Sequence, residues 1–143
     1  MEPAIQVGFE RDIKAQAAAL LGASESASLD ALIRQGIHLS AIDRVAAYGV
    51  NAVELGIISK AALKRRLSQG KTLTLCEGDK LYRAILATLF AETIFGNPHK
   101  SYIWLLKPRK ALGGQNALQA TATTPGYNAV VTLLERLRHG FAA

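Results

Sequence analysis

The side chains in this chain best suited to bind another molecule are basic, and one group of them lies at a sharp corner within residues 104–114. Lys107 must end a helix there, because a residue before proline is pushed out of the α region. Gly113 and Gly114 then permit a tight turn with positive φ. The cations at this corner could bind acidic groups, although an ordinary helix stop with solvated lysines has the same composition.

A second basic group lies in the middle of the chain, where no acidic residue occurs between Glu54 and Glu77. The cations in that interval are Lys60, Lys64, Arg65, Arg66 and Lys71. The whole chain has a formal net charge of +6, and its excess of positive charge is concentrated in this interval. A focused basic patch attracts phosphates or acidic protein surfaces.

The pattern around that patch is typical of a helix-turn-helix. We predict a short helix over residues 50–55, followed by a turn at Gly56. A second helix should run from Ser59 through Leu67, with Leu67 facing inward. The second helix of such a motif reads the major groove from its N-terminal end. A solvated basic helix face is the alternative. Because the first helix is short, phosphate contacts are expected more than base contacts. The residues predicted to face DNA are Ser59, Lys60, Lys64, Arg65 and Arg66.

The fold class that composition favours is all-α. The 143 residues are 50% hydrophobic, alanine and leucine dominate, and β-branched runs and turn dipeptides are sparse. Apolar spacing predicts helices from residue 9 to the final turn at Gly140. The helix that ends at Lys107 should bury Ile103 together with Leu105 or Leu106, and its Trp104 is more typical of a core anchor than of a ligand-stacking residue.

The longest predicted helix begins after a capping box, Thr74 with Glu77, and ends at Gly96. Because it is apolar on nearly all sides, it must be covered on all sides. We expect it to form the centre of the C-terminal half and also to contribute a dimer seam. Gly70-Lys71 is the predicted join, which divides the chain into an N-terminal region of residues 1–72 and a C-terminal domain of residues 73–143.

No arrangement of residues indicates catalysis. His38, His99 and His139 have no partner spacing for zinc. No glycine-rich phosphate loop and no Gly-x-Ser-x-Gly elbow occur. Glu77 and Asp79 are explained as charges at a helix start. The chain is therefore predicted not to be an enzyme and to use no metal and no cofactor.

Cysteine usage and hydropathy favour the cytoplasm. Cys76 is alone, so it forms no intramolecular disulfide, and we expect it to be a small buried apolar residue. The apolar stretch 15–21 is short and follows acidic residues, which argues against a signal peptide. The uncharged stretch 111–134 contains glycines and a proline, so it is not expected to span a membrane.

Beyond these physical patterns, one series of motifs has a known counterpart. In order they are Gly-Asn-Pro at 96–98, Trp104-Leu105, Pro108, Ala-Leu-Gly-Gly at 111–114, Thr-Pro-Gly at 124–126 and Arg-His-Gly-Phe at 138–141. This series resembles the C-terminal toxin-binding domain of the Xre/ParS/MbcA-type antitoxins, which pair with RES-domain toxins acting on NAD. The resemblance covers roughly residues 78–141 and extends more loosely over 28–77.

The resemblance implies a helical antitoxin that forms a homodimer, binds operator DNA to repress its own operon, and covers the active-site cleft of a cognate RES-domain toxin. It also implies a tail after Gly140 narrow enough to enter the toxin's cleft. The residues expected to bind the toxin are Trp104, Lys107, Arg109, Lys110, Gly113, Gly114, Arg138 and Phe141. The alternatives are a stand-alone helix-turn-helix regulator with a C-terminal dimerisation domain, and a helical scaffold without DNA contact.

Overall fold

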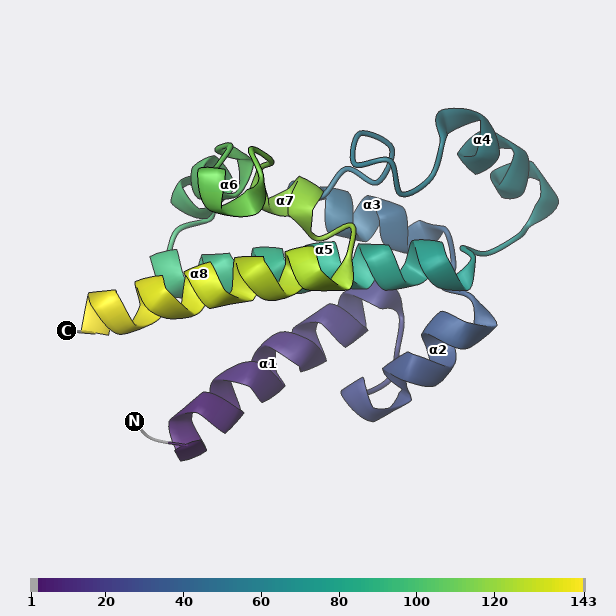
Figure 1. The fold of residues 1–143 in the computed structure, drawn as a ribbon. Helices are drawn as coiled ribbons and strands as arrows, with labels where there is room; N and C mark the ends of the chain where they lie inside the picture. The colour runs from purple at the N-terminus through teal and green to yellow at the C-terminus, as the bar shows by residue number, and fades with distance from the viewer. Residues whose placement is uncertain (1–2, 143) are drawn as a thin grey trace.

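The computed structural model describes the backbone of residues 3–142 and the side chains of residues 8–140, and within that part of the chain it is all-helical (Figure 1). The elements are α1 (Pro3–Leu21), η1 (Ser26–Ser28), α2 (Leu29–Gln35), α3 (Ser40–Ala46), α4 (Lys60–Gln69), α5 (Leu75–Phe95), α6 (Pro98–Leu106), η2 (Lys110–Leu112), α7 (Ala117–Ala120) and α8 (Thr124–Ala142). The predicted fold class is confirmed.

The centre of the molecule is α5, as its all-round apolar sequence predicted (Figure 1). The helices α1, α2, α6, α7 and α8 all contact it. Leu81, Ile85 and Leu89 are buried on one face, and Leu86 and Phe90 are buried on another. These faces are packed by helices of the same chain, and the dimer seam that we expected along α5 stays a prediction.

The start and end of α5 are determined by local signals. The Thr74 hydroxyl accepts a hydrogen bond from the Glu77 backbone N–H, and the Glu77 carboxylate accepts one from the Thr74 N–H, which completes the predicted capping box. At the other end Gly96 takes a left-handed φ of 65°. The hydrophobic core is one cluster that runs from α1 through α5 to α8, and α1 contributes Ile13, Ala17 and Leu21 to it.

A buried arginine on α5 holds the segment between α7 and α8 in place. Arg83 donates from Nε to the Thr121 carbonyl over 2.8 Å and from Nη2 to the Ala122 carbonyl over 2.9 Å. Its Nη1 forms an ion pair with Asp79. All three nitrogens are therefore satisfied, which makes the burial of this charge tolerable and ties the turn before α8 to the central helix.

Two expectations about the middle of the chain are wrong. Residues 50–55 form hydrogen-bonded turns and no helix, because the Asn51 side-chain oxygen accepts hydrogen bonds from the backbone N–H groups of Val53 and Glu54. On α4, Leu67 does not face inward but is 60% exposed. The helix α4 has no buried side chain and lies at the outer end of the molecule (Figure 1).

No helix within the described residues combines the length and the apolar character that crossing a membrane requires.

Candidate functional site

The corner between α6 and α7 has the predicted geometry. Lys107 adopts an extended backbone with ψ of 122°, which ends α6 before the proline. Gly113 and Gly114 have φ of 67° and 84°, conformations that a residue with a side chain rarely adopts. Lys107 and Lys110 are exposed on either side of this turn. The corner therefore presents two exposed ammonium groups and one stretch of backbone, at Gly113 and Gly114, without side chains.

Arg109 differs from that expectation, because it folds back onto the protein. Its guanidinium carbon lies 4.2 Å from the centre of the Trp104 ring, and its Nη2 donates to the Trp104 carbonyl over 3.0 Å. The Trp104 ring in turn lies 6.2 Å from that of Phe95. Burial lowers the pKa of Arg109 from its usual value. Trp104 and Arg109 thus shape the corner from within, and both side chains are half-buried.

The outer face of α6 is apolar and exposed, which the sequence reading missed. Leu105 is buried as expected, but Ile103 is 56% exposed and Leu106 is 40% exposed, and Tyr102 is also exposed. The residue that could have indicated this orientation is Ser101, which is fully buried on the same face as Leu105. We use the name α6 face for the exposed side chains of Tyr102, Ile103 and Leu106 on α6 together with those of Lys107 and Lys110, which follow the helix.

The end of α8 also departs from the expectation. The helix continues past Gly140 to Ala142, so Gly140 does not end it. Arg138 turns inward, with its guanidinium carbon 4.8 Å from the centre of the Phe9 ring and its Nη2 bonded to Glu135 over 2.9 Å. It therefore packs against α1 as well as pairing with Glu135. The side chain of Phe141 lies outside the described residues.

The basic helix α4 presents most, but not all, of the predicted cations. Lys60, Lys64 and Arg65 are exposed, and Ser59 caps the helix by accepting a hydrogen bond from Ala62 N–H over 3.0 Å. Arg66 was expected to project outward, but its guanidinium pairs with Glu77.

The Arg66–Glu77 pair joins α4 to the start of α5. Burial acts to raise the pKa of Glu77, but the hydrogen bonds from Arg66 and Thr74 outweigh burial and lower the pKa of this carboxyl below its usual value. Arg66 thus joins α4 to α5, alongside the partly buried Ala62 and Leu63 of α4, which pack against the core.

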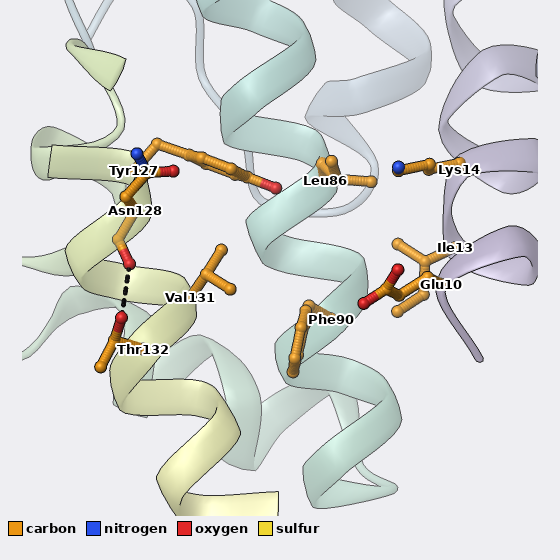
Figure 2. Close-up of a pocket in the computed structure, with 9 residues that line it drawn as sticks. All are labelled: Glu10, Ile13, Lys14, Leu86, Phe90, Tyr127, Asn128, Val131 and Thr132. Carbon is orange, nitrogen blue, oxygen red and sulfur yellow. Dashed lines mark hydrogen bonds between the residues drawn. The ribbon is translucent and has the colours of Figure 1, made fainter. Parts of the chain in front are cut away.

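A groove of about 400 Å³ lies between α1 and α8, over α5 (Figure 2). All three helices contribute apolar side chains to its lining. Polar side chains of α1 and α8 lie along its two sides. Burial raises the pKa of Tyr127, which reaches across the groove, to about 12. The lining residues are Glu10, Ile13, Lys14, Leu86, Phe90, Tyr127, Asn128, Val131 and Thr132. None of the predicted site residues lines it.

No cluster of three or more potential metal ligands occurs among the described residues. Cys76 is exposed, so the expectation that it is buried is wrong. It lies in the first turn of α5, before that helix enters the core.

Residues 90–140 match the model of the antitoxin Xre/MbcA/ParS C-terminal toxin-binding domain. The chain is also 33% identical over 85 residues to an antitoxin Xre of Pseudomonas putida, a match that covers 59% of this chain and 54% of that protein. The resemblance to the Xre-type antitoxins is confirmed.

This chain thus spans about half the length of the curated antitoxin it matches. The segment that matches the toxin-binding domain runs from the last turns of α5 to near the end of α8 and includes the corner and the α6 face. The basic helix α4 lies before this segment.

Proposed function

We propose that this chain is an antitoxin that captures a cognate toxin through the α6 face. The observation that carries the proposal is the exposure of Ile103 and Leu106 within the segment that matches a toxin-binding domain. Adjacent exposed apolar side chains rimmed by charge mark protein interfaces. Lys107 and Lys110 supply that rim here, and they favour an acidic surface on the partner.

The toxin we propose is a RES-domain protein that acts on NAD, as the resemblance to the antitoxins of such toxins implies. Inhibition would be by occlusion. A helical surface that covers the substrate cleft excludes NAD without any chemistry of its own. Gly113 and Gly114 allow a close approach of the corner's backbone to the toxin, because no side chain intervenes there.

The experiment that tests capture uses the protein encoded beside this chain. Expression of that neighbour alone should arrest growth and deplete NAD, and co-expression of this chain should restore both. Continued arrest in cells that contain the folded antitoxin would contradict the proposal.

We also propose that α4 binds operator DNA, with Lys60, Lys64 and Arg65 as its phosphate contacts. Support comes from their exposure, from the cap at Ser59 that fixes the helix start, and from the absence of acidic residues between Glu54 and Glu77. Binding as a homodimer is proposed with it, since helix-turn-helix proteins commonly read two half-sites. Residues 47–59 separate α3 from α4, which is longer than the usual turn of the motif. Phosphate contacts are therefore favoured over base reading.

The DNA proposal predicts a change in salt dependence. Replacing Lys60 and Lys64 by glutamine should reduce the slope of log affinity against log salt by about 0.9 for each lost phosphate contact. The measurement is fluorescence anisotropy with the DNA that precedes the coding sequence. The matched control carries Lys107→Gln and Lys110→Gln and should keep the original slope. An unchanged slope in the α4 variant would show that Lys60 and Lys64 do not contact DNA phosphates and would contradict the proposal for α4.

A further inference from the structure

A small pocket of about 210 Å³ lies beside the corner, between it and α8. Its apolar walls are the Trp104 ring and the side chains of Leu133 and Leu137. The other two lining residues are Arg109 and Arg136, so every charged group that lines the pocket is a cation. A pocket of this composition attracts an anion that also has an apolar part.

The two guanidinium groups have no acid to neutralise them. Among the described residues, neither Arg109 nor Arg136 forms an ion pair. Arg109 donates one hydrogen bond, to the Trp104 carbonyl, while its Nε is buried and has no acceptor. Its Nη1 donates no hydrogen bond within the described residues, so a ligand that supplies acceptor oxygens would give this guanidinium a partner. Arg136 is exposed and can attract such a ligand from solution.

The lining of the pocket, two guanidinium groups beside apolar side chains, favours a carboxylate over a phosphate. A carboxylate presents two coplanar oxygens that match the planar guanidinium, and its methylene groups can rest on the two leucines. Phosphate has no apolar part to place against the leucines and the tryptophan ring. We infer that this pocket takes the side-chain carboxylate of an aspartate or glutamate from the protein that the α6 face captures. This inference rests on the proposed function, and it specifies the chemistry that the partner must present.

The inference can be tested on the free protein with propionate as the probe. Trp104 is the only tryptophan in the sequence, so its fluorescence reports on this pocket. Propionate should change the emission saturably, whereas propionamide, which has the same shape without the charge, and inorganic phosphate at equal ionic strength should not. Arg136→Gln should weaken propionate binding by about fivefold. Lys100→Gln, which removes an exposed cation of α6 outside the pocket lining, should leave the affinity unchanged.

Three outcomes would overturn the inference: no saturable response to propionate, tighter binding of phosphate than of propionate, or equal affinities of the native protein and Arg136→Gln. Each of these can occur while the native chain still captures its toxin, in which case the proposed function survives and the carboxylate site does not. If propionate binds as described but the toxin is not captured, the proposed function fails, and with it the assignment of the carboxylate to that partner.

Discussion

Replacing Gly126 by alanine should destabilise the protein by at least about 3 kcal/mol, a lowering of the melting temperature by about 10 °C. A Cβ at this position would lie 1.9 Å from the carbonyl oxygen of Ala120 and 2.9 Å from its carbon. The obstacle is backbone, so no side-chain rotation can relieve the contact. Either α7 or the first turn of α8 must move, and Arg83 holds the segment between them through Thr121 and Ala122.

Gly140→Ala provides the matched control, because it makes the same change in the same helix. A Cβ at Gly140 meets nothing within 4 Å. Alanine is a better helix former than glycine, so this variant should be unchanged or more stable by less than about 1 kcal/mol. Thermal unfolding followed by circular dichroism measures both variants. Equal melting temperatures would show that the close approach of α7 to Gly126 does not determine stability.

The parts of the fold that the sequence predicted are those determined by short-range signals. The capping box of Thr74 and Glu77 and the turn after Lys107 each depend on residues within a few positions of one another. The central position of α5 was also predictable, because a helix that is apolar all round has no other stable environment. Residues 50–55 were misjudged because the Asn51 side chain offers the backbone an alternative to the helix.

The candidate site was less predictable, because the destination of a long side chain depends on residues that sequence spacing does not reveal. Arg66, Arg109 and Arg138 were all expected to face solvent or a partner. Each guanidinium instead contacts another part of the chain, namely Glu77, Trp104 and Phe9, although Arg109 also lines the pocket beside the corner. The error for Ile103 and Leu106 has a related cause. Helical periodicity predicts which residues share one face of a helix. It does not predict whether that face packs against the same chain or is exposed to bind another molecule.

The second large effect is expected on the α6 face. Replacing Ile103 by aspartate and Lys107 by glutamate should weaken toxin capture by at least about 100-fold. The first change removes an exposed apolar contact and leaves a carboxylate to be desolvated at the interface, and the second reverses a charge that faces an acidic partner. Both side chains are exposed, so the fold should be retained. The control variant, Leu67→Asp with Lys64→Glu, makes matching changes on α4, where Leu67 is equally open to solvent.

The measurement that tests toxin capture by the α6 face most directly is the dissociation constant of the purified complex with the co-encoded toxin, by titration calorimetry. The native chain and the α4 variant are expected to bind with the same affinity, and the α6 variant at least about 100-fold more weakly. Equal affinity of the α6 variant and the native chain would place the toxin on another surface and contradict the proposed role of the α6 face.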